Sequence, residues 1–133
     1  PPAGTPTATP TPSLVGPLRF TLAWTDAPGN PAAAKTLVND LDLEVIGPTG
    51  TRYRGNAGLY TGGQCLRAGQ WDACNNVEGV VIANAPAGVY TVVVYGVNVP
   101  QGPQPFALVG SGNNLRTALP PLNERVYLPM LRK

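Results

Sequence analysis

The 133-residue sequence contains no histidine. A Ser-His-Asp or Cys-His centre needs an imidazole to carry the proton during catalysis, so hydrolases of this kind are excluded for the chain itself. Glycoside hydrolysis needs only two suitably spaced carboxyl groups, which composition does not exclude, but so small a chain leaves little room for a substrate cleft. We therefore expect no catalytic site in this chain.

Charge is also scarce. Charged residues make up 12% of the sequence, about half the usual share, and the formal net charge is +2. The basic residues are scattered and form no concentrated patch for nucleic-acid phosphates. No apolar run approaches the roughly 20 residues of a membrane-spanning helix, and the first residues lack the order of a signal peptide. We expect neither a nucleic-acid partner nor a membrane span, and any secretion signal would lie outside this sequence.

The only two cysteines, Cys65 and Cys74, lie nine positions apart and flank a loop rich in Gly and Gln. In a secreted or extracellular chain, which the uncharged polar composition suits, they would most simply form one disulfide. In the simplest chain-entropy treatment it would add about 3 kcal/mol of stability. Two free thiols are the alternative. A zinc site is disfavoured because two thiolates without histidine do not complete a tetrahedral set of ligands.

Proline is concentrated at the two ends. Residues 1–16 alternate proline with threonine and small residues, which predicts a semi-rigid linker from a preceding domain. Residues 114–133 return to proline and contain the apolar stretch VYLPML. We expect an extended tail there, and an edge strand, a partner-binding peptide and a disordered end stay open. One domain is expected between them, at 17–113.

The middle of the chain alternates apolar and polar residues, as half-buried strands do. In the first expected strand, one face carries Leu18, Phe20, Leu22 and Trp24. The segment at 36–51 alternates in the same way and, with the return strand TRYRG, predicts a hairpin. Three β-prone runs follow, VEGVVIAN, VYTVVVYGVNV with a candidate bulge at its glycine, and FALVGSG. No stretch has helical periodicity, so we predict an all-β fold, an antiparallel jelly-roll β-sandwich of about seven to eight strands.

The stretch from about 55 to 76 contains both cysteines and has no clear period. A structureless stretch of this length inside a domain is usually functional or held in place by something. A disulfide and a metal ion are the two constraints that the sequence offers. Trp71 lies in this loop and is the candidate exposed aromatic for contact with a surface or a glycan.

Oxygen-bearing side chains are concentrated in two segments and one turn. The candidate metal ligands among them are Asp26, Asn39, Asp40, Asp42, Asn75, Asn76 and Glu78. Calcium takes six to eight oxygen ligands, and a cluster of like charges repels unless it is neutralised. These residues therefore predict a calcium site. The alternative is that the alternating carboxylates of the second strand form an ordinary solvated face.

Four motifs in succession carry a family resemblance. They are LAWTDAPG, TLVNDLDLEVIGPTGTRYRGN, NNVEGVVIANAPAGVYTVVVYGVNVP and GPQPFALVGSG, and they cover about residues 18–112. Together they resemble the jelly-roll β-sandwich, similar to the P-domain of pro-protein convertases, that follows the catalytic domain in certain secreted subtilisin-like serine proteases. The resemblance implies a non-catalytic domain that contributes stability and often binds calcium, here through the candidates in WTDAP, VNDLDL and NNVE. The two cysteines do not belong to these motifs.

The leading functional prediction is therefore a calcium-binding accessory domain of a secreted subtilisin-like serine protease. It would stabilise or orient the catalytic domain or capture substrate, and its expected partners are the preceding catalytic domain of the same polypeptide and a protein substrate or a cell-surface glycan. The Pro/Thr linker, which lets the domain stand away from its neighbour, argues against tight packing on the catalytic domain. A carbohydrate- or cell-surface-binding module is the alternative, and an adhesion module tethered by the linker is a third, because fold alone does not separate these functions.

Overall fold

A computed structural model of the chain describes residues 16–116. The predicted linker at 1–16 and tail at 114–133 lie almost entirely outside the described residues. Within them the fold has eight strands and no helix, and hence no helix long and apolar enough to cross a membrane. The strands are β1 (Leu18–Ala23), β2 (Asp40–Ile46), β3 (Arg52–Arg54), β4 (Leu66–Arg67), β5 (Trp71–Asp72), β6 (Val77–Ile82), β7 (Thr91–Asn98) and β8 (Ala107–Ser111). The all-β prediction is confirmed.

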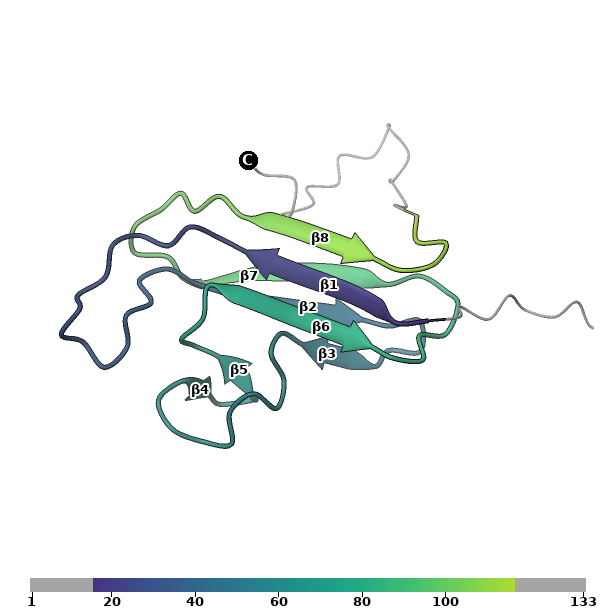
Figure 1. Cartoon of the computed structure of the whole chain (residues 1–133), viewed down its shortest axis with the longest axis horizontal. Coiled ribbons are helices and arrows are strands. Elements are labelled where there is room, and N and C mark those ends of the chain that lie inside the picture. Colours follow the sequence, from purple (N-terminus) through teal and green to yellow (C-terminus); the bar gives the residue numbers. More distant parts are fainter. Residues whose placement is uncertain (1–15, 117–133) are drawn as a thin grey trace, which may run out of the picture.

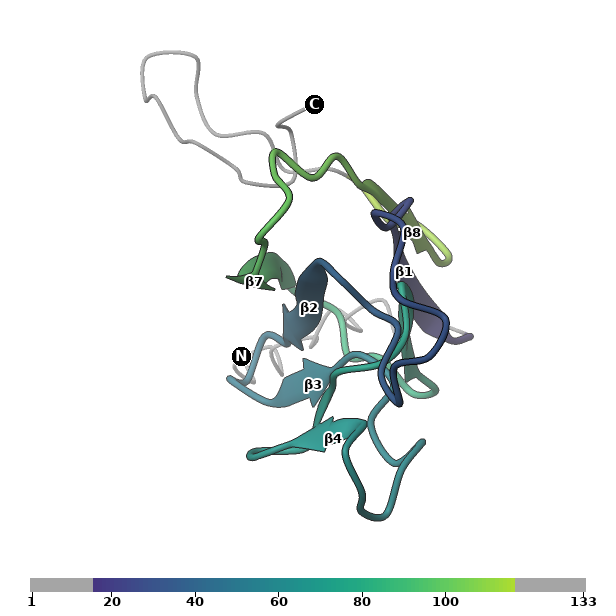
Figure 2. The ribbon, with the colours of Figure 1, turned by 90° about the vertical axis from the view of Figure 1, so that its left-hand side faces the viewer.

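The six longer strands form two three-stranded sheets that pack face to face (Figure 1). One sheet has the order β6-β1-β8 and the other β3-β2-β7, and every pairing is antiparallel. Figure 2 shows the two layers from the side, with the β4-β5 hairpin next to β3. The predicted antiparallel β-sandwich is therefore confirmed.

The core lies between the two sheets and follows the alternation of the strands. Its buried members are Leu18, Phe20, Leu22, Trp24, Leu41, Leu43, Val45, Val80, Ile82, Ala85 and Val94. The predicted apolar face of the first strand is confirmed. Trp24 also belongs to the core, as expected, and its indole nitrogen donates a hydrogen bond to the main-chain oxygen of Asn39 at 3.0 Å. The buried tryptophan therefore leaves no unpaired N–H in the apolar interior.

The predicted hairpin and bulge are both present. β2 pairs with β3 in an antiparallel register that sets Glu44 opposite Arg54. On the other side of β2, Asp40 lies opposite Asn98 whereas Leu41 lies opposite Gly96, which leaves Val97 as an extra residue. This is the bulge expected at the glycine of β7.

The stretch from 55 to 76, expected to be structureless, instead contains the β4-β5 hairpin. Each of its strands is two residues long, too short for a period to show in the sequence. The connecting turn uses positive φ angles at Gly69 (86°) and Gln70 (68°), and glutamine is an unusual residue for that conformation. The turn was therefore not recognisable from its sequence.

Asn56, just after β3, links one sheet to the other by hydrogen bonds. It adopts a left-handed conformation with φ of 53°, which asparagine tolerates better than most residues. Its backbone N–H donates to the oxygen of Gly79 at 2.9 Å, and its side-chain oxygen accepts from the N–H of Gly79 at 3.0 Å. Gly79 lies in β6, so Asn56 ties the end of β3 to the other sheet before the chain continues into the β4-β5 hairpin.

Candidate functional site

Three carboxylates point from β2 away from the core, at Asp40, Asp42 and Glu44. Their exposed fractions are only 4%, 2% and 3%, so the outer face of this strand is not solvated. The alternative of an ordinary solvated face is therefore wrong. Buried carboxylates must be paired with opposite charge or hydrogen-bonded, and the structure shows which groups do this.

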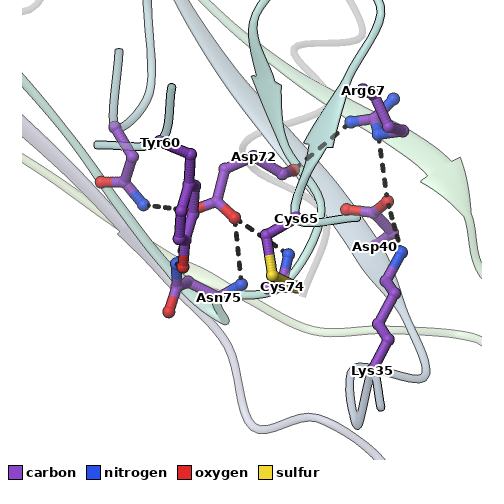
Figure 3. The surroundings of a disulfide bond; sticks show 9 residues. Lys35, Asp40, Tyr60, Cys65, Arg67, Asp72, Cys74 and Asn75 are labelled. Carbon is purple, nitrogen blue, oxygen red and sulfur yellow. Dashed lines mark hydrogen bonds and ion pairs between the residues drawn. A yellow bond between two sulfur atoms is a disulfide. The ribbon is translucent and has the colours of Figure 1, made fainter. Parts of the chain in front are cut away.

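Arg67, from β4, lies over two of these carboxylates. Its Nη2 donates to both side-chain oxygens of Asp42 at 2.5 Å, and its Nε lies 3.4 Å from Oδ2 of Asp40. Lys35 approaches the same oxygen of Asp40 at 3.8 Å (Figure 3). Arg67 is therefore the principal counter-ion of the acidic strand, and it comes from the loop that the sequence left without structure.

Burial and charge act against each other in this cluster. Burial raises the pKa of Asp42 and of Asp40, and the neighbouring Arg67 offsets only part of that rise. For Arg67 itself burial favours the neutral form, but the hydrogen bond to Asp42 and the negative charges around it give a net rise in its pKa. Because arginine stays protonated in proteins, the guanidinium is the fixed positive charge of the site.

The rest of this face is tied together by Glu44 and two aromatic residues. Glu44 accepts from Arg52 at 2.7 Å and from the hydroxyl of Tyr95 at 3.1 Å. The ring of Tyr95 meets the ring of Trp71 edge to face, with centroids 5.9 Å apart. On Trp71, the guanidinium of Arg54 lies 4.7 Å from the ring centroid. Trp71 thus anchors the β4-β5 hairpin on both β3 and β7. The side chain is half-buried, and its contact with a surface or a glycan stays a prediction.

The disulfide between Cys65 and Cys74 is present, as predicted. The two cysteines flank the hairpin directly, with Cα atoms 5.0 Å apart, and the N–H of Ala73 donates to the oxygen of Cys65 at 2.9 Å. Figure 3 shows the disulfide between the Arg67 cluster and a second one around Asp72. Covalent closure therefore limits how far Arg67 can move from β2.

Asp72 ends β5 and is satisfied by hydrogen bonds alone. Its side chain accepts from the amides of Asn56 at 2.6 Å and Asn75 at 2.7 Å, and from the backbone N–H groups of Cys74 and Asn75. Burial by itself would raise the pKa of Asp72, but these hydrogen bonds lower it below its ordinary value. This carboxylate is structural: it joins the hairpin to Asn56.

Glu78 differs from the other acids because it points into the core from β6. It is 1% exposed, and its Oε2 accepts the backbone N–H of Leu43 at 2.8 Å. Its Oε1 has no hydrogen-bond partner among residues 16–116. Burial raises its pKa to about 8; the Leu43 hydrogen bond opposes that rise, and nearby carboxylates such as Asp42 add to it. A neutral carboxyl group therefore stands inside the sandwich at pH 7.

The remaining candidate ligands anchor loops. Asp26 accepts from the backbone N–H groups of Val38 at 2.7 Å and Asn39 at 2.8 Å. The side chain of Asn39 exchanges two hydrogen bonds with the backbone of Gln101, and the amide of Asn76 donates to the oxygen of Trp24. These contacts hold the loops at one end of the sandwich.

The seven candidate ligands therefore fall into separate groups. They lie in the loop anchors (Asp26, Asn39 and Asn76), under Arg67 (Asp40 and Asp42), beside Asp72 (Asn75) and in the core (Glu78). Within residues 16–116, no three or more His, Cys, Asp or Glu side chains are arranged to hold a metal ion. Calcium binding by these residues stays a prediction.

Sequence reasoning missed the basic and amide partners of the acids, Arg67 and Asn56 above all. Arg67 lies two positions after Cys65, in a loop with no periodicity, so only the disulfide suggested that its position was fixed. Asn56 had no signal beyond the general tolerance of asparagine for left-handed turns.

No protein-family model matches the chain. The chain is similar to three proteins of Dictyostelium discoideum that are described as serine protease/ABC transporter B family proteins. It is 40% identical to tagB over 98 residues, 35% identical to tagA over 95 residues and 34% identical to tagD over 100 residues. These alignments cover 71%, 68% and 71% of this chain but only 5%, 5% and 6% of the respective relatives. The chain thus corresponds to a small segment of much larger proteins that are named as serine proteases.

Proposed function

We propose that this chain is a non-catalytic accessory domain of a subtilisin-like serine protease and that it works outside the cell. The observation that carries the proposal is the identity of 34% to 40% to segments of three protease-named proteins, in a chain that has no histidine. A serine protease triad needs a histidine, so the catalytic centre would lie in another part of the polypeptide.

The surface of the described domain supports a non-catalytic role. An open groove beside β3 is lined mainly by Arg52, Tyr53, Arg54, Asn56 and Gln70. No carboxylate, serine or cysteine lines this groove, so it offers neither a nucleophile of the common kinds nor a carboxylate general base. The acids of β2 are buried and paired, and the cysteines are joined to each other. The domain is therefore suited to act through its stability and position.

The disulfide supports an extracellular location. Disulfides persist in secreted proteins and are rare where thiols are kept reduced. The bond between Cys65 and Cys74 closes the hairpin from which Arg67 reaches the buried Asp42. An oxidising compartment fits this arrangement.

The test compares the full-length protease with a form from which this segment is deleted. We expect kcat/KM on a short peptide substrate to change by no more than about twofold, because the catalytic centre is intact. The half-life at elevated temperature, or the cleavage of a folded protein substrate, should fall. Deletion that changes neither the half-life nor the cleavage of the folded substrate would contradict the proposal, and so would peptide hydrolysis by the isolated 133-residue chain.

A further inference from the structure

We propose that Arg67 is the built-in counter-cation of the acidic strand β2, so that this domain neutralises its buried carboxylates without a divalent metal. The inference concerns the chain itself and does not depend on the protease role. It starts from the charge balance on the outer face of β2, where Asp40 and Asp42 are 4% and 2% exposed. Two buried carboxylates side by side repel each other unless a positive charge is held between them.

The geometry at Asp42 suits a guanidinium. Both oxygens of Asp42 accept from Nη2 of Arg67 at 2.5 Å, and the neighbouring Asp40 lies 3.4 Å from Nε of the same group. Arginine is the residue best suited to a partly buried carboxylate pair because its charge is permanent and its N–H groups diverge in a plane. Arg67 thus lies within ion-pair distance of both acids, and it donates its hydrogen bonds to Asp42.

A calcium ion does not fit the same oxygens. It would need six to eight oxygen ligands at about 2.3–2.6 Å. Placed on Asp42, it would lie beside the fixed positive charge of Arg67, which already occupies both oxygens of that carboxylate. The oxygens of Asp26 are likewise taken by the backbone N–H groups of Val38 and Asn39. The hydrogen-bond donors at Asp42 and Asp26 are nitrogen groups of the protein, whereas Oδ1 of Asp40 is buried without a hydrogen-bond partner among residues 16–116. At Asp42, therefore, the arrangement is that of a charge-paired site.

The hairpin explains why the arginine stays in place. Arg67 is in β4, two positions after Cys65, and the disulfide to Cys74 closes the loop. At the other strand of the hairpin, Trp71 packs against the ring of Tyr95 in β7. The disulfide and the Trp71–Tyr95 contact therefore fix the hairpin that carries Arg67, and the fixed hairpin keeps the guanidinium next to Asp42.

The first experiment measures the thermal midpoint of the 133-residue chain in buffer with calcium and in buffer with EDTA. The expected result is the same midpoint within about 1 °C, because a site without a metal gains no stability from ligand binding. A fall of several degrees in EDTA that added calcium reverses would overturn the proposal.

The second experiment compares Arg67→Met with Arg52→Met, a matched arginine that pairs with Glu44 on the same strand. Both arginines pair with a buried carboxylate, but Arg52→Met leaves Glu44 with its hydrogen bond from Tyr95, whereas Arg67→Met removes the positive charge next to both Asp42 and Asp40. We expect Arg67→Met to lower the midpoint by on the order of 10 °C and Arg52→Met by a few degrees at most. Equal losses would overturn the proposal.

A double variant separates the lost charge pair from lost packing. If Arg67 acts as the counter-ion, then Arg67→Met combined with Asp42→Asn should be more stable than Arg67→Met alone, because the unpaired buried charge is removed. A double variant that is less stable than Arg67→Met would contradict the proposal. If the Arg67 variants do not fold, the EDTA measurement on the unmodified chain still tests whether a bound divalent metal stabilises the domain.

Discussion

The buried carboxyl group of Glu78 should make the free energy of unfolding of this domain fall as the pH rises towards 8. The group is 1% exposed, and its pKa is raised from its ordinary 4.5 to about 8 by burial in the core. At pH 7 the folded chain therefore carries Glu78 mainly in the protonated form, while the unfolded chain carries it ionised. The perturbation that tests this is Glu78→Gln, which has nearly the same shape, keeps an oxygen for the N–H of Leu43 and cannot ionise.

The sign and size follow from the two pKa values. Between pH 4.5 and about 8 the folded state binds one proton more than the unfolded state, so the free energy of unfolding falls as the pH rises through this interval. At about 1.4 kcal/mol for each pH unit, the whole interval is worth about 5 kcal/mol as an upper limit. The part between pH 6 and pH 9 is roughly 3 kcal/mol.

The assay is urea unfolding at pH 6, 7, 8 and 9 for the unmodified chain and for Glu78→Gln. We expect the unmodified chain to lose stability across this range and the variant to lose much less. Asp72→Asn is the control: burial raises the pKa of Asp72, but hydrogen bonds lower it overall. Because burial is the largest cause of the raised pKa of Glu78, this variant should keep most of the loss of stability between pH 6 and pH 9 that the unmodified chain shows. Parallel curves for the unmodified chain and Glu78→Gln would refute the assignment of the pH dependence to Glu78.

Two further predictions concern the surroundings of the buried acids. Gly55→Ala should cost about 1–3 kcal/mol in urea unfolding, because the added Cβ would lie 2.8 Å from the Cβ of Glu78. Gly62→Ala, where no atom lies within 4 Å of the added Cβ, should stay within about 0.5 kcal/mol, and equal losses at the two glycines would contradict this packing. Replacing Cys65 and Cys74 by serine should lower the free energy of unfolding by about 2–4 kcal/mol. An unchanged urea midpoint would show that the hairpin holds without its disulfide.

The strands and the core could be predicted because alternation is a local signal. Leu18, Phe20 and Leu22 recur at every second position, and the same residues face the core in the structure. The bulge at Gly96 was also predictable from a local signal, because glycine inside a strand weakens the strand and often marks a bulge. The short strands β4 and β5 were not, because two residues contain no period.

Alternation does not predict the burial of the outer face of β2. A period of two shows that the strand has two faces, but it does not show which other segments cover each face. Asp40, Asp42 and Glu44 follow the pattern of a solvated face, yet all three are buried. Arg67, from a hairpin more than twenty positions further along the chain, pairs with Asp40 and Asp42, and Tyr95 of β7 donates to Glu44. Periodicity reports only on neighbouring residues, so a contact between such distant segments cannot be predicted from it.

The spacing of the acidic residues also does not determine which cation neutralises them. A row of carboxylates requires positive charge, and calcium and arginine supply it through different chemistry: calcium needs many oxygens around one point, whereas arginine needs its nitrogens fixed next to few oxygens. In this chain Asp42 faces nitrogen donors, and the donor group comes from a loop closed by Cys65 and Cys74. An acidic strand followed by a disulfide loop that contains a single arginine is therefore as good a pattern for an internal ion pair as for a metal site. What distinguishes the two is the response of the folded chain to EDTA.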